Sequence, residues 1–320
     1  MTISKIVASG SYLPSKIVTN FELEKSIDTT NQWIIERTGI EKRHIAATNQ
    51  LTSDLALEAS RSLFNSYDYN IEDVEMIVLA TTTPDLTFPA TATSLQAKLG
   101  AKKAFAFDVQ AVCSGFVYAL NIADNFIKTG QVKNALVVGA ETLSRIVDWQ
   151  DRNSCVLFGD GAGAILLEAN NSNDQRGIIS CNLNSDGNLN DILKTNGGVS
   201  YNQTTGFIEM LGKEVFRHAV EKMTSSILTA LKNANLAISD INLLIPHQAN
   251  IRILDGVAKK LNLSPEQVII TVDKHANTSA ASIPLALDYA WKKGKIKDND
   301  IVVFEALGGG LTWGSSIVRF

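Results

Sequence analysis

Cys113 is the residue of this chain with the clearest capacity for covalent chemistry. It lies in the segment AVCSG (111–115), and an apolar periodic run from Phe116 to Ile127 follows directly. This pattern predicts that the thiol stands at the N-terminus of a helix. There the unpaired backbone N–H groups and the positive end of the helix dipole favour the thiolate, which is the nucleophilic form of cysteine.

Two polar segments far downstream supply partners for such a nucleophile. His247 lies in IPHQAN (245–250), and Asn277 lies in HANTS (275–279). A cysteine, a histidine and an amide together can carry out thiol acyl transfer. Cys113 taken alone is equally compatible with a buried structural cysteine, because free cysteine packs as a small hydrophobe in most cores. The downstream segments favour the catalytic interpretation.

The chain resembles the β-ketoacyl-acyl-carrier-protein synthase III family. The resemblance rests on AVCSG, PHQAN, HANTS and the segment GGGLTWG (308–314), and it extends from GSYLP (10–14) to the C-terminal VRF. It implies a condensing enzyme that takes acyl-CoA, with acetyl-CoA the expected donor, onto Cys113. Extension with malonyl-acyl-carrier-protein then gives a 3-oxoacyl-acyl-carrier-protein and initiates fatty-acid biosynthesis. It assigns catalysis to Cys113, His247 and Asn277.

Composition sets wider bounds on the class of protein. The chain has 320 residues, 45% hydrophobic and 19% charged, which suffices for one large domain or two fused ones. Its net charge of -4 argues against nucleic acid as a partner. Three cysteines (Cys113, Cys155 and Cys181) at wide spacing give neither a disulfide framework nor a zinc pattern, so we expect a cytoplasmic protein. We expect no membrane span, no metal, and no cofactor apart from the coenzyme A thioester as substrate.

An internal echo indicates a duplicated chain. Residues 73–78 match 240–245, and residues 135–138 match 301–304, each an apolar run that predicts a buried strand. The spacing between the two runs is nearly equal in both places, which implies two similar halves.

Each half also contains a helix that ends near a glycine, Gly130 or Gly294. We therefore predict an α/β fold with an N-terminal half (1–170) and a C-terminal half (171–320), joined by a polar connection near 170–176. The resemblance implies the thiolase-like fold, in which the two duplicated halves pack in five layers, α-β-α-β-α.

The duplication predicts where the polar residues converge. Cys113 precedes one helix, and Asn277 precedes the equivalent helix at 283–292. Pseudo-symmetry brings the two helix starts together at the junction of the halves, where ligand crevices tend to form. His247 follows its strand, and strand ends commonly present side chains to a site.

The chemistry of such a crevice divides into two half-reactions. Thiolate attack on a thioester creates an oxyanion, which the backbone N–H groups of Cys113 and of Gly309 can stabilise. Decarboxylation of a malonyl thioester then creates an enolate, which donors from His247 and Asn277 can stabilise. Neutral donors suit this step, because a carboxylate would repel the developing charge.

The resemblance also implies the coenzyme A site. Segments 28–33 and 36–40 match the family's coenzyme A entrance, where Trp33 and Arg152 would enclose the adenine and Arg37 would contact phosphate. Thr29 and Asn250 are assigned to the same site. Without the resemblance, Trp33 is more simply a core aromatic.

Further positions match the family's partner surfaces. Phe88 matches the residue that reaches across a homodimer to close the acyl pocket, beside Leu307. Asn153 and Leu307 stand where some family members carry glycine and phenylalanine, which leaves the starter acyl group open. A basic patch for docking the acidic carrier protein is matched by Arg217, Arg252, Lys259 and Lys260. A solvated charged face is the alternative interpretation of these four residues.

Several other features have structural interpretations. His44 and His218 are expected to be structural or solvated, and the sequence alone does not choose between His247 and His275. FGDGAG (158–163) resembles a phosphate loop, but it precedes a strand and indicates a turn. Cys155 lies in an apolar run and is expected to be an inert buried thiol.

Four alternative functions stay open at this point. A related synthase could make a specialised polyketide or signalling product from another acyl donor. A cysteine hydrolase would use the same side-chain types. A degradative thiolase needs a second reactive cysteine near its C-terminus, where this chain has Gly308-Gly309-Gly310. A thioester-binding scaffold without activity is the fourth.

Overall fold

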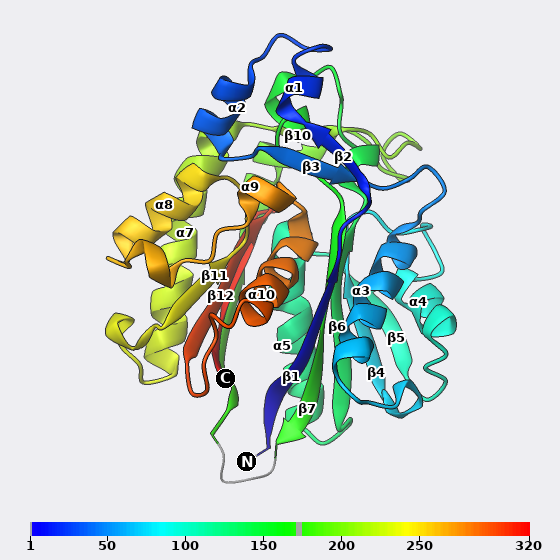
Figure 1. Ribbon diagram of the computed structural model, residues 1–320, viewed down its shortest axis with the longest axis vertical. Helices are drawn as coiled ribbons and strands as arrows, with labels where there is room; N and C mark the ends of the chain where they lie inside the picture. The colour runs from blue at the N-terminus through cyan, green and yellow to red at the C-terminus, as the bar shows by residue number, and fades with distance from the viewer. Residues whose placement is uncertain (1, 171–174) are drawn as a thin grey trace.

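The computed structural model describes residues 2–170 and 175–320, which form two large sheets with helices on both sides of each, together with two short sheets of two strands (Figure 1). The first part of the chain forms β1 (Ile3–Tyr12), β2 (Lys16–Thr19), α1 (Asn20–Leu23), α2 (Asn31–Thr38), β3 (Lys42–Ile45), α3 (Thr52–Ser66), β4 (Met76–Ala80), α4 (Thr91–Leu99), β5 (Phe105–Val109), α5 (Gly115–Lys128), β6 (Asn134–Glu141), α6 (Arg152–Cys155) and β7 (Gly161–Asn170). The second part forms β8 (Gly177–Ser185), β9 (Leu193–Thr195), β10 (Ile208–Met210), α7 (Gly212–Asn233), β11 (Leu243–Pro246), α8 (Ile251–Lys260), α9 (Val272–His275), α10 (Ser282–Lys292), β12 (Ile301–Gly308) and β13 (Thr312–Arg319).

The two sheets share one topology. The first large sheet has the order β1-β7-β6-β4-β5 and the second the order β8-β13-β12-β11, so that among the described strands of these two sheets only β5 lacks a counterpart. In both sheets two antiparallel pairs are followed by a parallel pair, β6 with β4 or β12 with β11. The edge strands β1 and β8 each carry a register shift, at Val7 and Ile179. The strands predicted from apolar runs are therefore present in equivalent places.

Each sheet draws on one side of the predicted division at residue 170. The predicted connection includes residues 171–174, which lie outside the described residues. The division of the chain into two duplicated halves stays a proposal, and the common strand order supports it.

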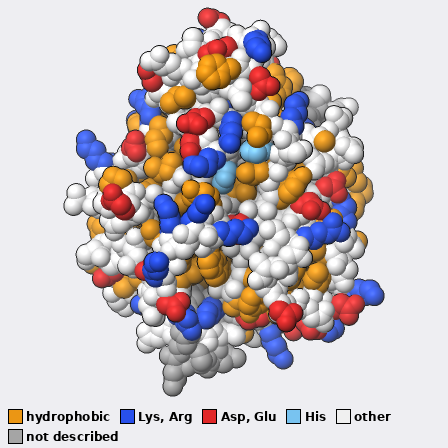
Figure 2. Space-filling view, in the orientation of Figure 1, with side chains coloured by type: hydrophobic (Ala, Val, Ile, Leu, Met, Phe, Trp, Pro, Cys, Tyr) orange, Lys and Arg blue, Asp and Glu red, His pale blue; other side chains and the backbone are white. Residues whose placement is uncertain are grey.

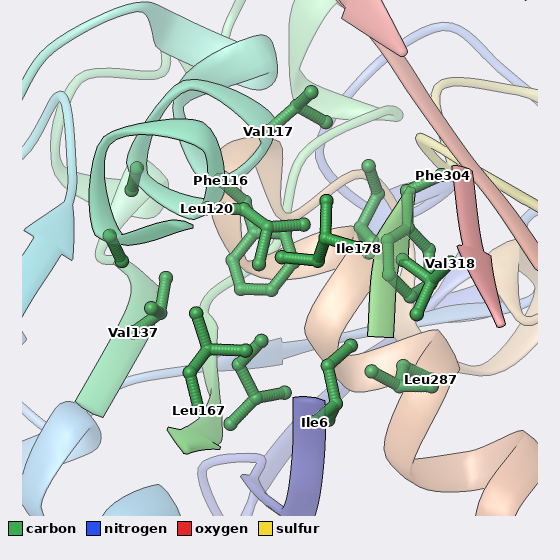
Figure 3. Close-up of a cluster of buried hydrophobic side chains, with 14 of the residues drawn as sticks. Ile6, Phe116, Val117, Leu120, Val137, Leu167, Ile178, Leu287, Phe304 and Val318 are labelled. Carbon is green, nitrogen blue, oxygen red and sulfur yellow. The ribbon is translucent and has the colours of Figure 1, made fainter. Parts of the chain in front are cut away.

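The helices and the two large sheets stack in five layers, which pack against one another through three apolar clusters. Helices α3 and α4 cover the outer face of the first sheet, α5 and α10 lie between the sheets, and α7 and α8 cover the outer face of the second sheet (Figure 1). In the central cluster, Phe116 and Leu120 of α5 lie beside Ile178, with Phe304 and Val318 of the second sheet close by (Figure 3). This arrangement confirms the thiolase-like α/β fold that the resemblance implies.

The central helices α5 and α10 are built alike. Both end before a glycine in the left-handed region, Gly130 (φ 74°) and Gly294 (φ 63°), as the sequence predicts. Each buries an aspartate, Asp124 or Asp288, to which the lysine one turn later donates at 2.7 Å. Because both helices pack against sheets on two sides, they are apolar over most of their surface. None of the helices in the described part of the chain has the length and apolar character to cross a membrane.

Candidate active site

Cys113 lies at the N-terminal end of α5, in the 3₁₀ turn Val112–Ser114. Val112 has φ 50°, a left-handed conformation that a β-branched residue rarely adopts. A Cβ atom at Gly308 would lie 2.6 Å from the Cys113 nitrogen, so β12 approaches this turn closely because glycine stands there. On the other side, the Ser114 and Thr312 hydroxyls are hydrogen-bonded at 2.7 Å. The turn that carries the sulfur is therefore fixed from two directions.

The sequence-based expectation about this thiol is right for its position and wrong for its resting charge. Burial raises the pKa of the Cys113 thiol to about 12, and the charge of Glu141 on β6 also raises it. Hydrogen bonding by the Ser279 hydroxyl and by the Cys113 backbone N–H opposes this rise without cancelling it. The helix N-terminus does not yield a resting thiolate, because desolvation penalises the charged form more strongly.

His247, directly after β11, is a neutral imidazole. Its side chain is buried, and burial lowers its pKa to about 3. Nδ1 lies 2.6 Å from the hydroxyl of Ser282, the first residue of α10. That hydroxyl oxygen accepts from the Gln248 N–H at 3.3 Å, so its own hydrogen is directed at Nδ1. We therefore assign the tautomer in which Nε2 carries the proton and is a donor.

Asn277 is held through both its backbone and its side chain. Its N–H donates to the Leu157 carbonyl at 2.9 Å, and its carbonyl accepts from the Gly159 N–H at 3.0 Å. Its Oδ1 accepts from the Ser279 N–H at 2.9 Å, which leaves the Nδ2 hydrogens as the donating end. The FGDGAG segment precedes β7, as its interpretation as a turn requires, and it has the further task of fixing Asn277.

One cavity joins these residues. Cys113, His247 and Asn277 line a space of about 1050 Å³ that both parts of the chain enclose. Leu307 lines the same space, with apolar side chains of α7 and α8 beside it. At Gly309, the second predicted oxyanion donor, a Cβ atom would lie 3.4 Å from the Val112 side chain. The structure thus brings the predicted catalytic residues together, with Gly309 beside the cysteine turn.

Asn250 is the predicted coenzyme A residue that lines this cavity. Its side-chain oxygen accepts from the Ile253 N–H at 3.1 Å and caps α8, so its amide nitrogen is the end left for a ligand. Gly39, after α2, lies against the start of the same helix, since a Cβ atom there would be 2.8 Å from that of Ile251. The helix that carries Trp33 and Arg37 therefore adjoins the cavity wall.

The other predicted coenzyme A residues lie together on the surface. The guanidinium carbons of Arg37 and Arg152 are 5.8 Å and 4.8 Å from the centre of the Trp33 ring. Thr29 lies in the loop before α2, close to Asp28, whose carbonyl accepts from Arg152 at 2.9 Å. An adenine between Trp33 and Arg152 needs about 3.5 Å on each side. The guanidinium must therefore move outward to admit a base.

The predicted partner residues are exposed. Phe88 is 83% exposed and does not line the cavity of its own chain. The proposed docking residues lie on α7 (Arg217) and α8 (Arg252, Lys259 and Lys260). Arg217 donates to Glu214 at 2.6 Å, and the Arg252 guanidinium lies 5.6 Å from the centre of the Phe216 ring. On the face drawn in Figure 2, basic side chains lie among acidic ones rather than in one uniform area.

The remaining candidates lie outside the cavity. His275 is buried with its ring edge-on to Tyr289, and Cys155 is a buried thiol whose pKa burial raises to about 11. Within residues 2–170 and 175–320, no cluster of His, Cys, Asp and Glu side chains is arranged to hold a metal ion.

Sequence reasoning missed three residues that support the site. They are Ser279 and Ser282, described above, and Glu141. The buried Glu141 carboxyl accepts from the hydroxyls of Thr81, Thr82 and Thr83 and from the Thr82 N–H, at 2.7–3.1 Å. The available signals were the run of three threonines after a predicted strand and two serines at the start of a predicted helix.

Comparison with known proteins agrees over the whole chain. Residues 107–187 match the family model of 3-oxoacyl-[acyl-carrier-protein (ACP)] synthase III, and residues 231–320 match the model of its C-terminal part. The β-ketoacyl-[acyl-carrier-protein] synthase III of Ehrlichia canis is 56% identical over 319 residues, 100% of both chains.

Solved structures agree as well. The crystal structure of 3-oxoacyl-[acyl-carrier-protein] synthase III from Aquifex aeolicus has a TM-score of 0.94 and 44% identity, covering 99% of this chain and 100% of that one. The priming β-ketosynthase of the R1128 polyketide pathway has a TM-score of 0.93 and 31% identity, covering 99% and 96%. With this similarity over the whole chain and the predicted catalytic residues in one cavity, the chain belongs to the 3-oxoacyl-[acyl-carrier-protein] synthase III family of condensing enzymes.

Proposed function

We propose that the chain condenses an acyl-CoA, with acetyl-CoA the expected starter, with malonyl-acyl-carrier-protein and so initiates fatty-acid biosynthesis. The observation that carries the proposal is the presence of Cys113, His247 and Asn277 in one cavity. A nucleophile and two neutral donors are what acyl transfer followed by decarboxylation needs.

In the first half-reaction the Cys113 sulfur attacks the thioester carbonyl. The new S–C bond and the cleaved bond to coenzyme A balance, and the thiol proton ends on the released coenzyme A thiol. The N–H groups of Cys113 and Gly309 are the proposed donors to the oxyanion. Their turns are held by tight backbone packing, which costs no reorganisation during the reaction.

In the second half-reaction the malonyl thioester loses carbon dioxide. The electron pair of the broken C–C bond passes to the thioester oxygen as an enolate. Nε2–H of His247 and Nδ2–H of Asn277 are the proposed donors to that oxygen, because Ser282 and the Ser279 N–H occupy their other ends. The enolate carbon then attacks the acyl group, and the Cys113 thiolate leaves and takes up a proton.

Thr29, Trp33, Arg37, Arg152 and Asn250 are proposed to hold coenzyme A. The exposed cations of α7 and α8 are proposed to dock the carrier protein. The exposure of Phe88 is compatible with a homodimer in which it closes the partner's acyl pocket. Homodimerisation and a cytoplasmic location stay predictions.

A related enzyme of specialised metabolism is the second candidate, favoured by the 31% identity to a polyketide priming synthase. A steady-state assay with acetyl-, butyryl- and branched acyl-CoA and malonyl-acyl-carrier-protein tests both candidates. We expect the highest kcat/KM with acetyl-CoA, with 3-oxoacyl-acyl-carrier-protein and carbon dioxide in equal amounts. Preference for a longer or branched starter would support the second candidate. Release of free acid without condensation would contradict both and indicate a hydrolase.

A further inference from the structure

Ser279 combines three features that the catalytic residues do not explain. It is 2% exposed and lines the cavity, and it has φ 48°, which L-residues seldom adopt. Among the described residues, no hydrogen bond of regular geometry ends on its hydroxyl oxygen. A buried hydroxyl without such a partner costs free energy, and strained backbone tends to occur at functional sites.

The surroundings of this hydroxyl indicate what it does. The turn Ser279–Ala281 packs against the turn Val112–Ser114, which carries Cys113, and against β6, which ends at Glu141. Hydrogen bonding by the Ser279 hydroxyl lowers the pKa of both the thiol and the carboxyl. These contacts fall short of regular hydrogen-bond geometry in the resting protein, and we take them as the ones that tighten when the sulfur ionises. The Ser279 N–H meanwhile fixes Asn277 at 2.9 Å.

We propose that Ser279 is a positioning residue that connects Cys113 to Glu141 and promotes ionisation of the sulfur at the moment of attack, a role that rests on the proposed function. In the resting state the Ser279 hydroxyl makes no regular hydrogen bond to the thiol or to Glu141. When the thiol loses its proton, to the released coenzyme A thiol during acylation or to solvent in the substrate-free protein, the hydroxyl turns and donates to the sulfur. A hydrogen bond to a charged group is stronger than one to a neutral group, so the contact stabilises the attacking form.

The other ionisable groups around the sulfur do not take this role. His247 is neutral and directed by Ser282, and the charged groups that line the wider cavity are Asp85, Arg145 and Lys194. Glu141 is the carboxyl whose charge acts on the thiol, and its effect is to raise the thiol pKa. Ser279 therefore interacts both with the group that opposes ionisation and with the group that must ionise.

Alkylation of Cys113 by iodoacetamide tests the proposal without any acyl substrate. Below the thiol pKa the rate is proportional to the thiolate fraction, and the Cys113 peptide can be followed by mass spectrometry. Ser279→Ala keeps the backbone N–H to Asn277 and removes only the hydroxyl. We expect alkylation about tenfold slower than in the wild type at each pH between 7 and 10, as for loss of a hydrogen bond to a charged group. Decarboxylation of malonyl-acyl-carrier-protein should stay within about threefold of the wild type, because Asn277 keeps its partner.

Two further variants separate this role from a structural one. Ser279→Gly also lacks the hydroxyl but accepts the positive φ, so it should reproduce the slow alkylation even if Ser279→Ala folds poorly. Ser282→Ala removes the partner of His247 and should lower decarboxylation while leaving alkylation unchanged. Wild-type alkylation rates in both Ser279 variants, or equal losses in alkylation and decarboxylation, would overturn the proposal. Failure of the proposed function itself would appear separately, as a wild-type protein that no acyl-CoA acylates.

Discussion

The turns that begin α5 and α10 have the same backbone and different side chains. Val112–Ser114 and Ser279–Ala281 are both 3₁₀ turns that lead directly into a helix, and their first residues have φ 50° and 48°. Aligned in this way, Cys113 corresponds to Ala280. The thiol of the first turn therefore has a methyl group as its counterpart in the second.

The difference between the turns follows from what each one faces. Ala280 packs against the first sheet, where a Cβ atom on Gly139 would lie 2.2 Å from the Ala280 carbonyl oxygen. Cys113 faces the cavity, which Ala280 does not line. In the proposed mechanism the first turn thus supplies the nucleophile, and the donors His247 and Asn277 come from the later part of the chain. A repeated backbone can position reacting groups precisely while the side chains divide the work.

Exchanging the side chains of Cys113 and Ala280 should have the largest effect on activity. In Cys113→Ala combined with Ala280→Cys, we expect acylation by acetyl-CoA to fall at least about a thousandfold, as for loss of a nucleophile. The new thiol would face packed backbone rather than the cavity. Intact-protein mass spectrometry measures the acyl adduct, with Cys113→Ala alone as the control. An adduct on the peptide that carries position 280 would show that the two turns are interchangeable.

The proposed donors His247 and Asn277 should act on one half-reaction alone. For His247→Ala and Asn277→Ala we expect malonyl decarboxylation to fall about 100- to 1,000-fold, as for loss of one oxyanion donor. Acylation of Cys113 should persist, because neither side chain takes part in it. Carbon dioxide release and acyl labelling report the two steps separately. Loss of acylation with intact decarboxylation would reverse the assigned roles.

The sequence predicts the frame of this site better than its electrostatics. Apolar runs, glycines and the internal echo locate β4, β6, β11, β12 and the starts of α5 and α10, because local periodicity determines these features. The protonation of Cys113 depends on burial between two sheets, which no local pattern reports. Ser282 forms a hydrogen bond with His247, which is 35 residues away in the chain. The Glu141 carboxyl accepts hydrogen bonds from residues 58 to 60 positions earlier in the chain. Only the folded chain reveals such partners.

Each of the two large sheets also buries a glutamate, Glu141 in the first and Glu305 in the second, and the surroundings of their carboxyl groups differ. Glu141 is surrounded by donors, whereas both Glu305 oxygens lack a hydrogen-bond partner among the described residues, and burial raises the pKa of Glu305 well above its usual value. We expect Glu141→Leu to lower the free energy of unfolding by about 2–4 kcal/mol, because several donors lose their acceptor. Glu305→Leu should raise it by about 1–2 kcal/mol at pH 8.

The pH dependence of stability tests whether the ionisation of Glu305 destabilises the folded protein. Because its folded-state pKa is raised, the unfolded chain ionises first, and wild-type stability falls as pH rises above the unfolded value. Glu305→Leu should lack this part of the fall. Urea unfolding at pH 5 and pH 8 measures the free energy of unfolding of the wild type and of Glu305→Leu. A lower free energy of unfolding in Glu305→Leu at both pH values would contradict the prediction.

Charge reversals on the two outer helix layers should have the smallest effect. Arg252→Glu on α8 should raise the KM for malonyl-acyl-carrier-protein about fivefold at low salt, since rim charges chiefly steer association. The KM for acetyl-CoA should not change, and added salt should weaken the wild-type interaction as charges are screened. Arg61→Glu, an exposed arginine of α3 on the opposite layer, is the matched control. Equal carrier kinetics in both variants would make the α8 cations a solvated face.

Burial of the Cys113 sulfur also affects how readily this thiol reacts with oxidants. Peroxides and disulfides react with thiolates, and at a pKa of about 12 only about one thiol in 100,000 is ionised at pH 7. The pKa values of Cys155 and Cys181 are raised as well, and neither residue lines the cavity. No second sulfur is therefore placed to form a disulfide there. We therefore expect the Cys113 thiol to react slowly with oxidants and to stay reduced when no thioester is bound.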